Sequence, residues 1–119
     1  MDAQKLFLHS QCFFYAYSLG YSLDHGVVEV LHKFIETHVD DLPKTVCKIK
    51  PPYNFEINSD WLTKNDFTED VRRRIQNILC ILIYHSCVFA NASGRKIVKA
   101  DDMLSVTLLS SEIINVCLP

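Results

Sequence analysis

The chain has 119 residues, 49% of them hydrophobic, which is enough for one domain with a core of its own. A formal net charge of −2 excludes a protein that binds nucleic acid over its whole surface. Cys12, Cys47, Cys80, Cys87 and Cys117 are odd in number and widely spaced, which favours reduced thiols in an intracellular protein over a disulfide framework. The N-terminus lacks the layout of a signal peptide, and no segment has the roughly 18 uninterrupted apolar residues of a membrane helix.

The first predicted helix covers residues 3 to 19 and ends at Gly20. Its apolar residues recur at helical spacing and include several aromatic rings. Each large apolar side chain removed from water contributes about 1.5–3 kcal/mol, so we expect this stripe to belong to the core rather than to bind a cofactor. The stripe consists of Leu6, Phe7, Cys12, Phe13, Phe14, Ala16, Tyr17 and Leu19.

A second helix is predicted from Val27 to Leu42, with Asp24 as its N-cap, because apolar residues again recur at steps of three and four. The helical period is then lost from Pro43 to Phe67, where prolines and turn-forming residues are frequent. We expect a long connection there, with a short extended piece at residues 53 to 57 as one option. A connection of this length either packs through its aromatic residues or has a function of its own, and the sequence leaves both open.

A third helix of about 25 residues is predicted to begin at Thr68, whose hydroxyl can accept a hydrogen bond from a free backbone amide, and to end at Ser93. From Ile78 to Ile83 every residue is apolar or cysteine. A helix that is apolar on all faces must be enclosed on all sides, and three other helices of a small chain are few for that task. We therefore expect a second protein chain to cover it.

A basic loop follows, in which Gly94 ends the long helix. Asp101 and Asp102 then open a last helix, where their negative charge is favourable beside the helix N-terminus. The apolar side of this helix is formed by Met103, Leu104, Val106, Thr107, Leu108, Ile113 and Ile114.

The stretch from Gly94 to Thr107 resembles the histone fold, as found in core histones, centromere proteins and subunits of general transcription factors. Members of that family have a basic pair, an apolar pair, a polar residue, a small residue and an aspartate that heads the last helix of the fold. The resemblance implies an ion pair between the loop arginine and an aspartate seven residues later, which are Arg95 and Asp102 here. The matching residues are Arg95, Lys96, Ile97, Val98, Lys99, Ala100 and Asp102.

The resemblance implies one all-α domain over residues 1–119, a histone fold with a long central helix. The helix at residues 27 to 42 would be the first helix of the fold, residues 3 to 19 an extra N-terminal helix, and residues 43 to 67 an enlarged first loop. A second registration aligns the chain with the histone fold differently. In it, the segment from Leu19 to Asp24 and the helix that follows form the first part of one fold unit, and the chain carries pieces of two such units.

In the histone family the central helix is enclosed by the same helix of a second chain. The resemblance therefore implies pairing with another histone-fold protein, with a heterodimer favoured over a homodimer, in a chromatin, centromere or transcription complex of the nucleus. No catalysis, cofactor, metal, membrane or small-molecule substrate is expected. The predicted pairing surface consists of Ile75, Ile78, Leu79, Leu82, Ile83, Phe89, Val106 and Leu109.

Two basic clusters lie at opposite ends of the long helix, about 30 Å apart. Histone-fold pairs bring the loop of one chain beside the helix start of its partner, where basic side chains and free amides can bind phosphates. Double-stranded DNA is therefore a second implied partner, and a solvated charged face is the alternative. The residues predicted to contact DNA are Arg72, Arg73, Arg95, Lys96 and Lys99.

The sequence offers no motif for catalysis or for metal binding. His85 and Cys87 are neighbours, but they point about 200° apart on a helix and cannot easily share one ion. In the adjacent pairs Asp40-Asp41 and Asp101-Asp102 the two side chains point in different directions, which argues against two carboxylates that share a proton. The sequence also has no glycine-rich phosphate loop. The main alternative to a histone-fold subunit is a helical adaptor, viral or signalling, that binds a partner helix in a groove.

Overall fold

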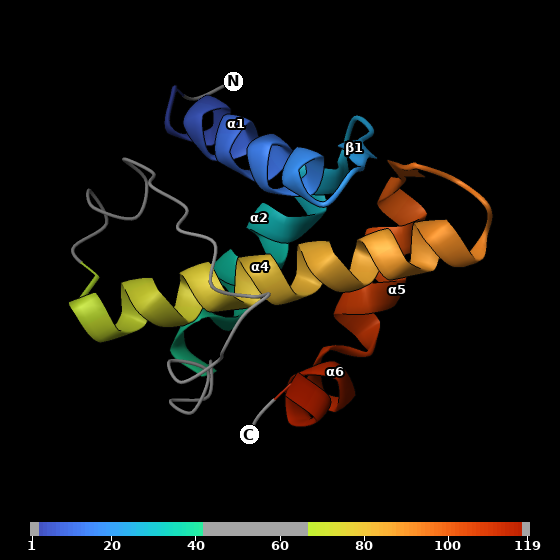
Figure 1. The fold of residues 1–119 in the computed structure, drawn as a ribbon. Helices are drawn as coiled ribbons and strands as arrows, with labels where there is room; N and C mark the ends of the chain where they lie inside the picture. Colours follow the sequence, from blue (N-terminus) through green and yellow to red (C-terminus); the bar gives the residue numbers. More distant parts are fainter. Residues whose placement is uncertain (1–2, 42–66, 118–119) are drawn as a thin grey trace.

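A computed structural model describes residues 3–41 and 67–117, which are mostly helical, as predicted (Figure 1). Two strands of two residues each are the remaining regular elements of the described part. The predicted connection at residues 43 to 67 lies outside the described residues except for Phe67. The elements are α1 (Ala3–Ser18), β1 (Ser22–Leu23), α2 (Val27–His38), the 3-10 turn η1 (Val39–Asp41), α4 (Glu69–Ala92), β2 (Ile97–Val98), α5 (Ala100–Leu108) and α6 (Ser110–Cys117).

Helix α4 is the centre of the fold and crosses the molecule, with α1 on one side of it and α6 on another (Figure 1). It packs against α1, α2, α5 and α6. Every residue from Ile78 to Ile83 is fully buried. The chain's own helices pack on this apolar middle, so its burial does not require a second chain, and pairing with a partner stays a prediction.

The length and hydropathy of α4 also meet the criteria for a membrane-spanning helix. Of its most apolar window, 61% is buried inside the protein. The same composition is typical of a core helix surrounded by other helices, which is the environment that α4 has here.

Both ends of α4 are fixed as the sequence predicted. The hydroxyl of Thr68 accepts a hydrogen bond from the backbone N–H of Val71 at 3.2 Å. At the other end Gly94 has φ +73°, a left-handed conformation that favours glycine, and the N–H of Arg95 returns to the carbonyl of Ala90 at 2.9 Å. These bonds satisfy backbone groups that the helix itself leaves unpaired.

The two short strands join the loop after α1 to the loop after α4. Strand β1 pairs in parallel with β2, with Ser22 opposite Ile97 and Leu23 opposite Val98. The N–H of Ser22 donates to the carbonyl of Lys96 at 3.0 Å, and the N–H of Asp24 donates to the carbonyl of Val98 at 2.8 Å. Two helix–strand–helix units, α1–β1–α2 and α4–β2–α5, are thereby connected through their loops within one chain.

The predicted N-cap of the second helix is wrong. The carboxylate of Asp24 accepts the N–H of its neighbour His25 at 2.8 Å, and the helix begins three residues later, at Val27. Gly26, with φ +87°, precedes the helix and requires a conformation that L-residues rarely adopt. The carbonyl of Asp24 still accepts the N–H of Val27 at 3.4 Å, so Asp24 belongs to the turn before the helix.

The predicted last helix is two helices, since α5 ends at Leu108 and α6 begins at Ser110. The N–H of Leu109 donates to the carbonyls of both Ser105 and Val106. Such a shared bond tightens the last helical turn and is typical of a helix end. The break turns the chain, and Ile114 of α6 is then buried.

Candidate partner interface

The loop between α4 and α5 is held by a two-pronged ion pair between Arg95 and Asp102. Nη1 and Nη2 of Arg95 lie 2.8 and 3.0 Å from the two carboxylate oxygens of Asp102, and Nη1 also donates to the carbonyl of Ile97. The carboxylate additionally accepts the backbone N–H of Lys99 at 2.8 Å, which caps the start of α5. The predicted ion pair is confirmed in the geometry that guanidinium and carboxylate groups prefer.

These contacts change the protonation equilibria of both partners. Hydrogen bonds from Arg95 and from the backbone of Lys99 lower the pKa of Asp102 from its ordinary value. The same carboxylate raises the pKa of Arg95. Both groups therefore stay charged at neutral pH, and the ion pair between them persists there.

The basic residues predicted to contact DNA lie in two separate places, and several have partners within the chain. Arg95 is engaged by Asp102. Arg73 lies 3.7 Å from Glu69, and Arg72 donates to the carbonyl of Phe67 at 3.0 Å. Lys96 and Lys99 have exposed side chains at the β2 loop. Contact with DNA stays a prediction, and these two lysines are the side chains of the loop best placed for it.

The residues of the predicted pairing surface lie mainly inside the chain. Ile75, Ile78, Leu79, Leu82, Ile83 and Val106 are fully buried. Phe89 is half-buried, and Leu109 is exposed. In this conformation the six buried side chains contact the chain's own helices, so a partner would have to bind elsewhere on the surface.

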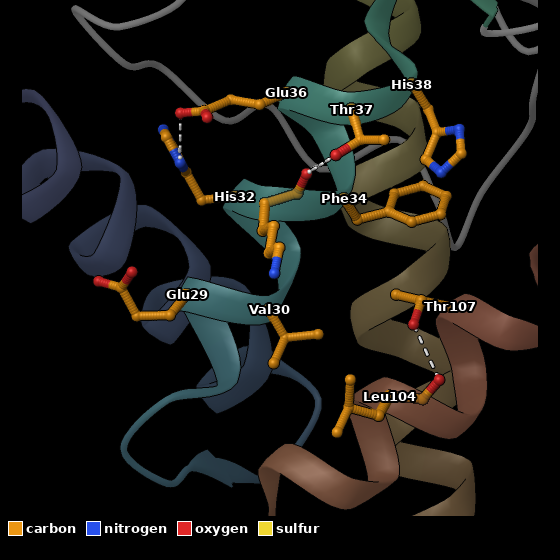
Figure 2. A pocket seen from close by; sticks show the side chains of 10 residues that line it. Glu29, Val30, His32, Phe34, Glu36, Thr37, His38, Leu104 and Thr107 are labelled. Atoms are coloured by element: carbon orange, nitrogen blue, oxygen red, sulfur yellow. Dashed lines mark hydrogen bonds and ion pairs between the residues drawn. The ribbon is translucent and has the colours of Figure 1, made fainter.

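Helix α5 presents one such surface, together with the neighbouring face of α2. Leu108 is 83% exposed and Leu104 is 47% exposed, and they lie one helical turn apart. Figure 2 shows Val30 and Phe34 of α2 on the side that faces Leu104 and Thr107 of α5. These residues line a groove of about 600 Å³ between the two helices. We name this region, with Leu108, the α2–α5 groove.

The rim of the α2–α5 groove is polar and carries both signs of charge. Glu29, Lys33 and Glu36 of α2 belong to it. Nδ1 of the buried His32 lies 2.8 Å from a carboxylate oxygen of Glu36, and Figure 2 shows this contact directed away from α5. All of these charges belong to α2, and apolar residues beside a polar, charged rim are usual in protein–protein contacts.

A second apolar surface lies on α1, where the sequence predicted core. Tyr17 is 80% exposed, Phe14 64% and Phe13 39%, so the expectation that these rings are buried is wrong. Among the side chains of α1 that the structure describes, those of Cys12, Tyr15 and Ala16 are buried. Two small residues four positions apart let the helix approach α4 closely, and this turns the larger rings outward. The small residues Cys12 and Ala16 could have indicated which side of the helix is buried. Helical periodicity alone does not single them out, because it treats small and large apolar residues alike.

The described thiols lie in the interior of the protein. Cys12, Cys80 and Cys87 are free and buried, and burial raises the pKa of Cys12 and raises that of Cys87 to about 12. Such thiols remain protonated and unreactive at neutral pH. Partial burial lowers the pKa of His85. Within residues 3–41 and 67–117, no three His, Cys, Asp or Glu side chains are grouped so that they could hold a metal ion.

Comparisons with known proteins give no relative for this chain: no family model, no curated protein and no solved structure matches it.

Proposed function

We propose that this chain is a non-enzymatic, histone-fold-like subunit that pairs with another histone-fold protein in a chromatin, centromere or transcription complex of the nucleus. The subunit has a structural role, and a heterodimer is favoured over a homodimer. The chain encloses its own central helix, so pairing adds to a fold that the chain completes by itself.

The observation that carries the proposal is the contact between the two loops. The β2 loop, fixed by Arg95 and Asp102, lies in parallel beside β1, a few residues before α2 begins. Histone-fold pairs bring the same kind of loop beside the helix start of a partner chain. The arrangement supports the registration in which the chain carries pieces of two fold units, one opening with α1–β1–α2 and one ending with α4–β2–α5.

The α2–α5 groove is the surface that we assign to the histone-fold partner. Leu104 and Leu108 are exposed, whereas Val30 and Phe34 are half-buried against the core. The rim offers charges of both signs that can fix the register of a partner. Covering Leu104 and Leu108 would contribute about 1.5–3 kcal/mol for each side chain, before the entropy cost of association. Clusters of exposed large apolar side chains are typical of interaction sites.

Affinity purification of the tagged chain from nuclei, followed by mass spectrometry, tests the proposal. We expect a histone-fold protein in equimolar amount with the wild type, and its loss when Leu104→Asp and Leu108→Asp are combined. Ser105→Asp is the control for added negative charge, because it places one carboxylate at an exposed position of the same helix, against two in the test variant, and it should retain the partner. Loss of the partner in both variants, or a major partner without a histone fold, would contradict the proposal.

A helical adaptor is the second candidate function, and the shape of the α2–α5 groove favours it. A groove with an apolar floor between two helices can hold the apolar face of a single amphipathic helix. The two functions differ in the partner. An isolated helical peptide from the co-purified protein should bind as tightly as the whole protein if the chain is an adaptor. It should bind far more weakly if a folded histone-fold partner is required.

A further inference from the structure

The exposed rings of α1 form a continuous surface with β1. Phe13, Phe14 and Tyr17 of α1 lie beside Tyr21 and line a hollow of about 500 Å³ that Ser10, Ser22 and Leu23 complete. The wall of the hollow is mostly apolar, and its volume lies within the usual range of binding pockets. We name these residues the aromatic surface. It is formed by α1 and β1, whereas the α2–α5 groove is formed by two other helices.

Two of these rings are mostly exposed in the described part of the chain. Tyr17 and Phe14 are mostly in water, although the other face of the same helix is fully buried at Cys12 and Ala16. Large aromatic side chains are the residues that contribute most when they enter a binding interface, because they bury much area and lose little conformational entropy. The aromatic surface therefore has the composition of a recognition site.

A lysine lies at the edge of this surface. Nζ of Lys96 is 4.6 Å from the centre of the Tyr21 ring and 3.4 Å from its hydroxyl oxygen. Within the described part of the chain, no carboxylate lies at ion-pair distance from Lys96, whereas Arg73 and Arg95 each have one. The nearby Asp24 directs its carboxylate to the N–H of His25. The aromatic surface thus ends at a positive charge for which residues 3–41 and 67–117 supply no acidic partner.

We propose that the aromatic surface binds an acidic peptide segment with bulky apolar side chains. The apolar side chains of the peptide pack against the rings of Phe14 and Tyr17, and a carboxylate of the peptide pairs with Lys96. Charge complementarity selects the acidic peptide, since a basic segment would be repelled by Lys96. A single-stranded nucleic acid fits less well, because it places a phosphate at every nucleotide and needs a row of cations beside the rings.

Fluorescence anisotropy with the full-length chain tests this proposal. The probe is a labelled synthetic peptide of about ten residues in which aspartate alternates with leucine and phenylalanine. We expect Lys96→Glu to weaken binding about tenfold or more, and Tyr17→Ala combined with Phe14→Ala to do the same. All three side chains are exposed, so the variants should keep the circular dichroism spectrum and the thermal midpoint of the wild type.

Two controls separate this surface from the rest of the molecule. Lys33→Glu changes an exposed lysine of the α2–α5 groove and should leave the affinity within about twofold of the wild type. A probe with lysine in place of aspartate should bind weakly to the wild type and better to Lys96→Glu. That gain of binding cannot result from damage to the fold.

Several results would overturn the proposal. They are no binding of the acidic probe, equal binding of the acidic and basic probes, and displacement of the acidic probe by a single-stranded oligonucleotide at lower concentration than by unlabelled peptide. A dimer of this chain that dissociates on Tyr17→Ala would assign the surface to a second copy instead. The histone-fold proposal is tested separately, by substitutions at Leu104 and Leu108.

Discussion

Residues 3–41 and residues 67–117 each place a helix, a two-residue strand and a second helix in the same order, but they differ in what holds the loop between the helices. In the second unit Arg95 and Asp102 fix the loop by an ion pair. In the first unit the turn depends on Gly20 and Gly26, both with positive φ, and on backbone bonds to β2. The second unit supplies most of the core, and the first supplies the exposed aromatic surface. The comparison teaches that the unit with the ion-paired loop supplies most of the buried core, whereas the unit with the glycine turns leaves large aromatic rings exposed.

The largest effect should follow from a change in the core of the second unit. Leu79 is fully buried in α4, so Leu79→Ala should lower the free energy of unfolding by about 2–5 kcal/mol. Leu108→Ala is the control, because Leu108 is 83% exposed and its truncation should cost within about 0.5 kcal/mol. Urea denaturation measures both. If Leu79→Ala weakened only a dimer and left the unfolding of the monomer unchanged, the assignment of α4 to an intrachain core would be wrong.

The turns of the two units should respond alike to loss of glycine. Gly20 has φ +89° and Gly94 has φ +73°, and a Cβ atom at either position would meet nothing within 4 Å. The cost of Gly20→Ala and of Gly94→Ala is therefore conformational, about 1–2 kcal/mol each. Asparagine tolerates the left-handed conformation better, so Gly20→Asn and Gly94→Asn should cost less. A neutral effect of Gly20→Ala in thermal denaturation would show that the first turn has another conformation.

The start of α4 offers a smaller effect. Thr68→Ala removes the hydroxyl that accepts the N–H of Val71 and should destabilise the protein by about 1 kcal/mol. Thr68→Ser keeps the acceptor and should restore nearly all of this loss. An equal loss in both variants, measured by urea denaturation, would assign the role of Thr68 to packing of its methyl group.

The smallest effect concerns how the stability contributed by Asp102, in the loop of the second unit, depends on pH. Because the pKa of Asp102 in the folded protein is lowered below its ordinary value of 3.8, its contribution to stability is present above that pH. The contribution is lost as the pH falls through the lower pKa of the folded state. Asp102→Asn should therefore be less stable than the wild type at pH 7, and this difference should shrink towards pH 2. A difference that does not depend on pH would contradict the ion pair.

The features predicted from the sequence are those that depend on local chemistry at a fixed spacing. Thr68 as a cap, Gly94 as a helix end and the pair of Arg95 with Asp102 were predicted, because each needs only a few neighbouring residues. The break at Leu109 was missed, since neither glycine nor proline marks it.

The features that were not predicted depend on how the elements pack. The aromatic rings of α1 and the small residues Cys12 and Ala16 are all apolar, so periodicity could not decide which side faces α4. Enclosure of α4 by its own chain depends on the parallel pairing of β1 with β2, a contact between residues about 75 positions apart. No local pattern in the sequence encodes such a contact.

Cross-linking of the two loops tests the central claim most directly. Ser22 and Ile97 are exposed strand partners, so Ser22→Cys and Ile97→Cys should be joined by a short thiol-reactive cross-linker in a variant whose Cys47 and Cys117 are changed to serine. We expect a cross-linked monomer at all protein concentrations, because both loops belong to the same chain. Covalent dimers as the main product, even in dilute solution, would show that the loops pair between chains and would contradict the account.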